Sequence, residues 1–311
     1  MQAFCNGELV PVGEASVSAL DAGIQHGVGL FETMQAFNGR VFRLDAHLAR
    51  LIDSASELGL TRDLRHGPLR ETVEHTLRAN EMAEARVRLT VTGGDLSLLG
   101  RAAGGGAGAG DGGGGAGQSG RHTPTIVCVV SAPTRYPRGF FEEGVMVTIT
   151  DARANPFEPG AGHKTLNYWS RLRALADASG AGAGESLWFT VTNHLCGGSV
   201  SNALLVKDGA IITPIARGEE VEAGLPSPVL PGVTRAAVLE VAELMEIPVH
   251  RQMVAIDDVL GADEAMLTNS SWQVLPVTAV ERKPIGGGGV GPITRAIRSK
   301  LLELIESETA G

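Results

Sequence analysis

A glycine-rich tract places the firmest limit on how this chain folds. Residues 101–120 contain 11 glycines in twenty positions. Such a segment has few side chains to bury, so we expect a flexible insertion at the surface, outside any core. The segments on either side, 85–92 and 125–131, are rich in β-branched residues, which are typical of strands. These two strands are therefore predicted to be joined by an enlarged hairpin loop.

The remaining pattern indicates an α+β protein of two domains. In the first part, Asn38-Gly39 marks a hairpin turn, apolar residues recur at helical spacing over 45–58, and a second helix is predicted over 69–80. Periodicity then breaks at 132–139, which contains two prolines. Further strands and helices follow, ending in an amphipathic helix after residue 292. The predicted organisation is an N-terminal domain (1–133), a linker (134–139) and a C-terminal domain (140–311).

Composition narrows the kinds of molecule that this chain is expected to bind. The chain has 311 residues, 43% of them hydrophobic, and a net charge of −9. This acidic balance argues against a nucleic-acid or anionic membrane partner, and no segment approaches the ~20 apolar residues of a membrane span. The three cysteines have no metal-type spacing, which indicates neither a disulfide framework nor a metal site. We expect a cytoplasmic protein.

Lysine usage limits where amine chemistry can occur. Only four of the 26 basic residues are lysines: Lys164, Lys207, Lys283 and Lys300. Arginine cannot form a Schiff base, whereas a desolvated lysine can. Lys207, Lys283 and Lys300 occupy segments typical of solvent-exposed positions, while Lys164 lies between a glycine-rich turn and an aromatic-containing segment. A surface position for Lys164 is the ordinary alternative.

Three further segments could hold an anion. Pro231-Gly232-Val233-Thr234-Arg235 opens a predicted helix, whose free N–H groups and Thr234 hydroxyl would suit a phosphate. The segment 268–271 (TNSS) supplies similar donors. Arg50 falls on the less apolar side of the helix predicted at 45–58. Helix capping, turn formation and a solvated helix face explain the same residues equally simply.

Seven short motifs follow one another in a distinctive order. They are NG (6–7), DAG with HGVGLFET (21–23 and 26–33), HLARL (47–51), KTLNY (164–168), GSVSN (198–202), LPGVTR (230–235), and TNSS with LPV (268–271 and 275–277). Together they resemble the class IV aminotransferases. These are fold-type-IV pyridoxal phosphate enzymes that include branched-chain and D-amino acid aminotransferases and aminodeoxychorismate lyase.

The resemblance implies a two-domain fold like that of D-amino acid aminotransferase, with pyridoxal 5′-phosphate as cofactor. Lys164 would carry the cofactor as a Schiff base and move a proton between substrate and cofactor, with Tyr168 beside it. The resemblance also implies a site built between two domains and partly from a neighbouring subunit, so we expect a homodimer. The implied cofactor-binding residues are Arg50, Val233, Thr234 and Ser270 at the phosphate, with Gly198 nearby, and the implied substrate-pocket residues are His26 and Arg88.

One position departs from the family pattern. The family has a glutamate immediately before the Gly-Ser motif, where it bonds the pyridine nitrogen and keeps it protonated. This chain has Gly197 there. The electron-accepting power of the ring should be weakened unless an acid from elsewhere in the fold substitutes.

Three functions therefore remain open. The first is a pyridoxal-phosphate-dependent aminotransferase acting on a small amino acid and keto acid pair. The second is an aminodeoxychorismate lyase, which eliminates pyruvate, because Asn269-Ser270 looks more like that branch than the Gly-Thr form of branched-chain enzymes. The third is a catalytically degenerate relative that binds the cofactor or a metabolite without turnover.

Overall fold

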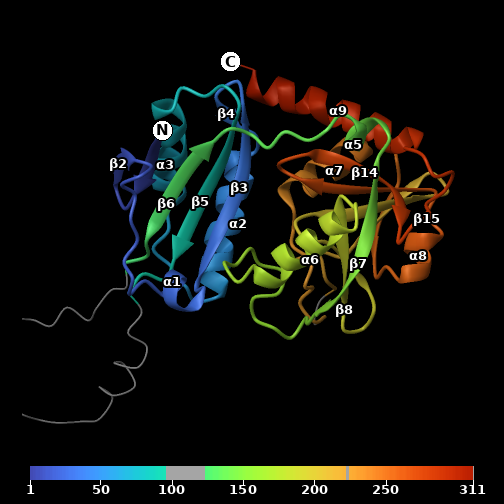
Figure 1. Cartoon of the computed structure of the whole chain (residues 1–311), viewed down its shortest axis with the longest axis horizontal. Coiled ribbons are helices and arrows are strands. Elements are labelled where there is room, and N and C mark those ends of the chain that lie inside the picture. Colours follow the sequence, from blue (N-terminus) through green and yellow to red (C-terminus); the bar gives the residue numbers. More distant parts are fainter. Residues whose placement is uncertain (96–122, 222–223, 311) are drawn as a thin grey trace, which may run out of the picture.

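The structure is a computed structural model that describes residues 1–95, 123–221 and 224–310. The insertion predicted at 101–120 lies outside the described residues. Two sheets with their own helices lie side by side, and one long connection joins them (Figure 1).

The first sheet has six strands in the order β2-β1-β6-β5-β3-β4, and each neighbouring pair is antiparallel. Helices α2 and α3 pack on it. Leu48 and Leu51 confirm the apolar stripe predicted for α2, and α3 contributes Val73. Its elements are β1 (Gln2–Cys5), β2 (Glu8–Pro11), α1 (Ala22–His26), β3 (Gly29–Phe37), β4 (Arg40–Val41), α2 (Leu44–Glu57), α3 (His66–Ala79), β5 (Ala85–Thr92) and β6 (Ile126–Ser131).

The predicted pairing across the glycine-rich tract is confirmed. β5 and β6 are antiparallel neighbours, with a register that runs from Arg86 opposite Ser131 to Val91 opposite Ile126. On the other side of β5, strand β3 pairs along its length. The two segments that flank the tract are thus central strands of the sheet.

The second sheet is mixed and has nine strands in the order β12-β11-β10-β13-β14-β7-β8-β9, with β15 paired to β14. Helices α7 and α9 pack together and bury a shared apolar cluster against it that includes Leu204, Val238 and Ile297. Its elements are α5 (Gly139–Glu142), β7 (Val145–Ala154), α6 (Trp169–Gly180), β8 (Glu185–Thr190), β9 (Leu195–Gly198), β10 (Asn202–Lys207), β11 (Ala210–Pro214), α7 (Val233–Leu244), β12 (Val249–Gln252), α8 (Ile256–Leu260), β13 (Glu264–Asn269), β14 (Gln273–Val280), β15 (Lys283–Pro284) and α9 (Pro292–Thr309).

A short backbone ladder joins the two halves. The N–H of Phe31 donates to the carbonyl of Lys164 at 3.0 Å, and the N–H of Leu166 donates to the carbonyl of Gly29 at 2.9 Å. Gly29 permits this approach, because a Cβ there would lie 2.7 Å from both the Leu166 side chain and the Val91 carbonyl. The start of β3 therefore fixes the segment that contains Lys164.

Some elements escaped prediction for physical reasons. β14 contains Pro276, and β9 ends in two glycines, so neither has the composition of a typical strand. The domain boundaries 1–133, 134–139 and 140–311 remain a prediction, although the sheets do part between β6 and β7. Within the described ranges, no helix has the length and apolar character needed to cross a membrane.

Candidate active site

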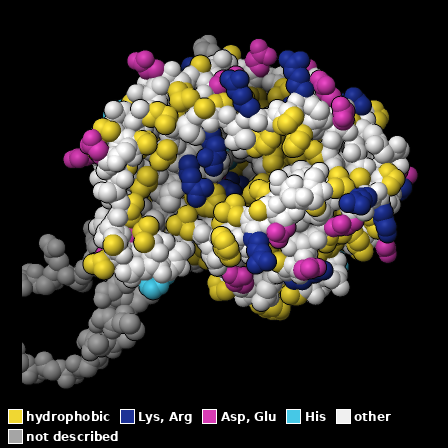
Figure 2. All heavy atoms as spheres, in the orientation of Figure 1, with side chains coloured by type: hydrophobic (Ala, Val, Ile, Leu, Met, Phe, Trp, Pro, Cys, Tyr) yellow, Lys and Arg dark blue, Asp and Glu magenta, His cyan; other side chains and the backbone are white. Residues whose placement is uncertain are grey.

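A cavity of about 340 Å³ lies where the two halves meet. Basic side chains gather in the hollow that opens there (Figure 2). The cavity walls include five arginines and lysines but no aspartate or glutamate among the described residues. The basic residues are Arg50, Arg86, Arg88, Lys164 and Arg171. A cavity with this lining favours a ligand that carries several negative charges.

Lys164 lies in this cavity. Its Nζ is 4.4 Å from the ring centre of Phe31 and 5.4 Å from that of Tyr168. Its side chain is half-buried, whereas the other three lysines of the chain are exposed. Lys164 is thus the one lysine with both an enclosed amine and access to a cavity.

Tyr168 holds a fixed position beside that amine. Its ring packs edge-on against Phe31, with ring centres 5.2 Å apart, and its hydroxyl donates to the carbonyl of Ser199 at 3.2 Å. These contacts tie the segment before α6 to the turn between β9 and β10. Tyr168 can therefore present its hydroxyl to a ligand that lies against Lys164.

The N-terminus of α7 forms another wall. Gly232, Val233 and Thr234 line the cavity, and the first-turn N–H groups of a helix suit a phosphate. Arg50 reaches this turn from α2, where its Nη1 donates to the carbonyl of Pro231 at 2.9 Å. The predicted phosphate residues from two distant segments thus come together.

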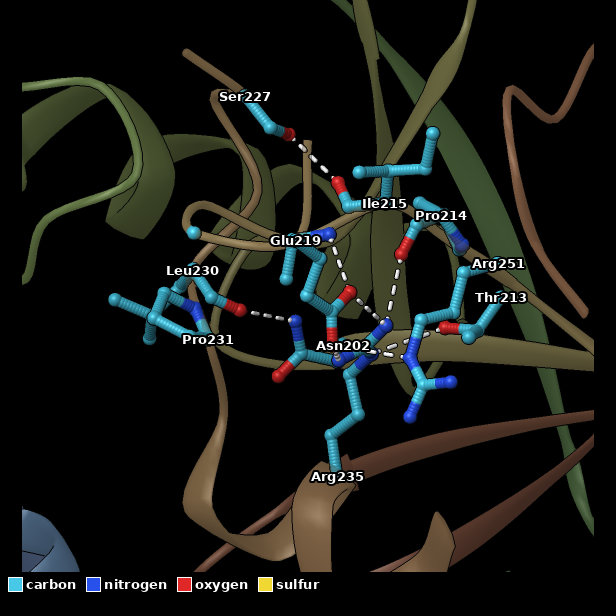
Figure 3. A network of polar contacts seen from close by, with 12 residues as sticks. Asn202, Thr213, Pro214, Ile215, Glu219, Ser227, Leu230, Pro231, Arg235 and Arg251 are labelled. Atoms are coloured by element: carbon cyan, nitrogen blue, oxygen red, sulfur yellow. Dashed lines mark hydrogen bonds and ion pairs between the residues drawn. The ribbon is translucent and has the colours of Figure 1, made fainter. Parts of the chain in front are cut away.

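A buried polar network holds the α7 turn (Figure 3). Asn202 Nδ2 donates to the Leu230 carbonyl at 2.8 Å. Arg235, which is 3% exposed, donates to Thr213 Oγ1 at 3.1 Å, to the Pro214 carbonyl at 3.0 Å and to both carboxylate oxygens of Glu219 at 2.8 Å. Arg235 belongs to the motif that was predicted to bind an anion. Its side chain instead bonds β11 and Glu219 and thereby holds the start of α7 in position.

Gly232 makes this turn possible, because a Cβ at that position would clash with Asn202 Oδ1. We expect Gly232→Ala to displace Asn202, to cost about 1–3 kcal/mol in unfolding free energy and to weaken phosphate binding. Chemical denaturation and titration with inorganic phosphate measure both effects. Gly287→Ala is the control, since nothing lies within 4 Å of a Cβ there. Equal behaviour of the two variants would contradict this account of the turn.

The turn between β13 and β14 completes the cradle. Ser270 lines the cavity as predicted, together with Thr268 and Asn269. The Oγ1 of Thr268 is buried and has no hydrogen-bond partner within the described part of the chain. A buried hydroxyl without a partner at a cavity wall fits a site that receives a polar ligand. Together with Lys164 and the α7 turn, this donor set fits an aldehyde that carries a phosphate.

Sequence reasoning missed the residue that positions Arg50. Glu32, on β3, is 1% exposed; it accepts from Arg50 Nη2 at 2.6 Å and from Arg50 Nε at 2.8 Å. His47 Nδ1 lies 2.8 Å from Glu32 Oε2. Both residues stand in quoted motifs, but only their meeting across β3 and α2 shows that they form one buried cluster.

The charge state of this cluster follows from its burial. Burial alone would raise the pKa of Glu32, but the charge of Arg50 and the His47 hydrogen bond outweigh it and hold that pKa at about 2. Burial lowers the pKa of His47 from its ordinary value of 6.5, against the opposing effect of Glu32. At neutral pH the cluster therefore holds an ionised Glu32 and a neutral His47.

This arrangement predicts acid sensitivity. Below about pH 6.5 the unfolded chain takes up a proton on His47 that the folded protein excludes, so stability falls by up to about 1.4 kcal/mol per pH unit. Below about pH 4.5 the same argument adds Glu32. Denaturation at several pH values tests this against His47→Gln, in which the first contribution should be absent. His163, whose pKa is also lowered by burial, is common to both proteins. Identical pH slopes would contradict the assignment to His47.

Arg88 lines the cavity as predicted, and Arg86 lies beside it. Burial lowers the pKa of Arg88, and the charge of Arg86 lowers it further. The guanidinium of Arg88 stacks on Phe31, with its Cζ 3.8 Å from the ring centre. The prediction missed Arg86, although the alternation of strand side chains places residues 86 and 88 on one face. Thr134 and Tyr136, from the predicted linker, complete this wall.

His26 lies elsewhere. It is the last residue of α1, it is exposed, and it does not line the described cavity of this chain. Arg50, Lys164, Tyr168, Gly198, Val233, Thr234, Ser270 and Arg88 do line it. The roles of all these residues remain predictions.

Gly197 has a backbone that excludes a side chain. Its φ is +134°, and a Cβ would lie 2.6 Å from the Ser201 carbonyl oxygen. Glu185 is a buried acid that contacts the same loop. Its carboxylate accepts from the N–H of Ser199 at 3.1 Å and of Val200 at 3.2 Å, and from Ser201 Oγ at 3.1 Å. Glu185 thus braces the loop and is not part of the cavity lining.

Comparison with known proteins places the chain in a family. Residues 29–280 match the family described as amino-transferase class IV. D-alanine aminotransferase of Bacillus licheniformis is 28% identical over 100% of this chain and 99% of its own length. The structure of 4-amino-4-deoxychorismate lyase from Pseudomonas aeruginosa is 28% identical, covers 97% of this chain and 98% of its own, and superposes with a TM-score of 0.77.

The fold agrees with a third protein. The structure of the T.th. branched-chain amino acid aminotransferase with pyridoxamine 5′-phosphate gives a TM-score of 0.83 at 24% identity, over 98% of this chain and 94% of that chain. The chain belongs to the class IV aminotransferase family. The predicted family, the α+β fold of fold type IV, and an enzyme of the aminotransferase or lyase kind that uses pyridoxal phosphate are thereby confirmed at the level of the family.

Proposed function

We propose that this chain is a pyridoxal-phosphate-dependent aminotransferase that acts on a small amino acid and keto acid pair. The observation that carries the proposal is the half-buried Lys164 amine in a basic cavity that is also lined by a helix N-terminus. Pyridoxal phosphate, when bound, supplies an aldehyde that combines with amines and a ring that accepts electrons. The relative with pyridoxamine 5′-phosphate supports this choice of cofactor.

The residues that line the cavity would divide the work between binding the phosphate and reacting with the aldehyde. The α7 turn, with Arg50 and Ser270, would bind the phosphate through N–H groups, a guanidinium and a hydroxyl. Lys164 Nζ would bind the aldehyde and then hold and return a proton as a general base and acid. Tyr168 would orient the ligand through its hydroxyl.

The wall formed by Arg86 and Arg88 suits the carboxylate of an amino acid. We expect Arg88→Gln to lower kcat/KM for a dicarboxylate amino donor about 10- to 100-fold, because a charge-assisted hydrogen bond of roughly 1.5–3 kcal/mol is lost. Most of the loss should appear in KM. Arg138→Gln, an exposed arginine outside the cavity, is the control. An unchanged KM in Arg88→Gln would contradict this role.

The lyase is the second candidate, and two observations favour it. Asn269-Ser270 lines the cavity in the form typical of the lyase branch. Two neighbouring arginines also suit a substrate with two carboxylates. Assays of amino donors with pyruvate and 2-oxoglutarate, in parallel with aminodeoxychorismate, separate the two reactions. Pyruvate release from aminodeoxychorismate without transamination would replace the first candidate by the second.

The homodimer and the cytoplasmic location belong to the same proposal. The proposed interface includes Leu20, just before α1, and Ile24, within α1, which are 60% and 65% exposed. The three cysteines are free thiols, which suits a reducing compartment. Analytical ultracentrifugation tests the dimer, and Ile24→Glu should shift it toward the monomer.

A further inference from the structure

Arg171 brings a positive charge to the part of the cavity where the family pattern has a negatively charged glutamate. Arg171, in the first turn of α6, lines the cavity and is half-buried. Its Nη1 donates to the carbonyls of Gly198 at 3.2 Å and Ser199 at 3.3 Å, the two residues that follow Gly197. The guanidinium is therefore bound to the segment from which the family's glutamate projects.

A second contact places Arg171 at the same point. Its Cζ lies 4.9 Å from the ring centre of Trp188. Trp188 is the residue directly opposite Gly197 in the ladder between β8 and β9. The arginine is thus held from two sides against position 197, by carbonyls and by an aromatic face.

No described acidic side chain is available at position 197. Gly197 cannot carry a side chain in its observed conformation. Glu185 accepts from four donors, three in the loop after β9 and the N–H of Ser186. Glu32 is bonded to Arg50 and His47. Among the described residues that line the cavity, none is acidic.

We propose that Arg171 occupies the place of the missing carboxylate and faces the ring nitrogen of the cofactor, which it keeps unprotonated. This inference rests on the proposed function. A guanidinium has five N–H donors, no acceptor, and a charge it does not lose. A pyridine nitrogen with a free lone pair can accept from it, whereas a protonated one needs an acceptor and is repelled by the charge.

This contact changes the chemistry available to the site. A ring with an unprotonated nitrogen withdraws electrons less strongly than one kept protonated by a carboxylate. The reaction then depends more on Lys164 as proton carrier and on the basic cavity walls. Arg171 would set the charge state of the cofactor ring by direct contact, and this effect can be measured without turnover.

The test is the protonation state of the ring in the loaded protein. Pyridoxal phosphate labelled with ¹⁵N in the ring is bound to the wild type, to Arg171→Glu and to Arg173→Glu, and the ¹⁵N resonance is recorded from mildly acidic to mildly alkaline pH. Arg173 is the matched control on the same helix, with a side chain that is 72% exposed. The wild type and Arg173→Glu should show the resonance of an unprotonated pyridine at every pH. Arg171→Glu should move it to the position of a protonated pyridine.

Each result decides the question. A protonated ring in the wild type overturns the inference, even if Arg171→Glu fails to fold. An unprotonated ring in a correctly folded Arg171→Glu overturns it as well. Absence of any bound cofactor signal overturns the proposed function and this inference with it, whereas a bound but protonated ring leaves the proposed function intact.

Discussion

Lys164→Ala is expected to lower the rate of transamination by about 10⁴-fold or more, because one substitution removes both the nucleophile and the proton carrier. No other lysine can replace it, since Lys207, Lys283 and Lys300 are exposed and none of them lines the cavity. The measurement is single-turnover kinetics with an amino donor that the wild type accepts. The protein should remain folded, because the Nζ of Lys164 is not paired with a carboxylate in any described ion pair.

Lys207→Ala is the matched control for this prediction. Lys207 is exposed and forms an ion pair of 3.2 Å with Asp263 at the surface. Its removal should leave the rate unchanged. If Lys164→Ala kept a rate near that of Lys207→Ala, another amine would carry the chemistry and the assignment of the site would be wrong.

Glu32→Gln should produce the largest loss of stability, about 3–5 kcal/mol, because it leaves a buried guanidinium without its counter-charge. Glu32 is 1% exposed and bonds both Arg50 and His47, so the amide cannot satisfy the same donors. We also expect weaker phosphate binding, since Arg50 loses the contact that aims it at the α7 turn. Urea denaturation and phosphate titration give the two quantities.

Glu57→Gln is the control that distinguishes the effect of burial from the effect of losing a negative charge. Glu57 pairs with Arg217, but its side chain is 52% exposed, and such pairs contribute at most about 1 kcal/mol. The two substitutions change the same group in different surroundings. A loss in Glu32→Gln no greater than that in Glu57→Gln would show that the buried cluster does not stabilise the fold as argued.

Local sequence patterns predicted the parts of the fold that depend on local physics. The apolar spacing of α2, the Asn38-Gly39 turn and the paired strands beside the glycine-rich tract all follow from short-range periodicity and turn chemistry. β14 could not be predicted in this way, because it contains Pro276. A proline within a run of residues argues against a strand inside a sheet.

The candidate site was likewise predicted only where local sequence patterns were informative. Lysine scarcity narrowed the candidates to four, and the surrounding sequence singled out Lys164, which the structure places in the cavity. The other parts of the site come from distant elements: Glu32 and Arg50 meet across β3 and α2, and Arg171 reaches from α6 to the turn after β9. Contacts between segments so far apart have no signature in a single sequence.

The reason for glycine at position 197 could be found only from the structure. The sequence showed that a carboxylate is absent, and the backbone shows why none can stand there, since φ is +134° and the Ser201 carbonyl fills the space. The expected substitute was another acid. The side chain that the structure brings to this point is Arg171, whose charge is opposite.

The central claim is that Lys164 holds the cofactor, and reduction with borohydride tests it most directly. Wild-type protein incubated with pyridoxal phosphate is reduced, digested and mapped by mass spectrometry. The account predicts a single stable adduct, on the peptide that contains Lys164, together with loss of the yellow absorption band. An adduct on Lys207, Lys283 or Lys300 instead, or the same adduct yield in Lys164→Ala, would contradict it.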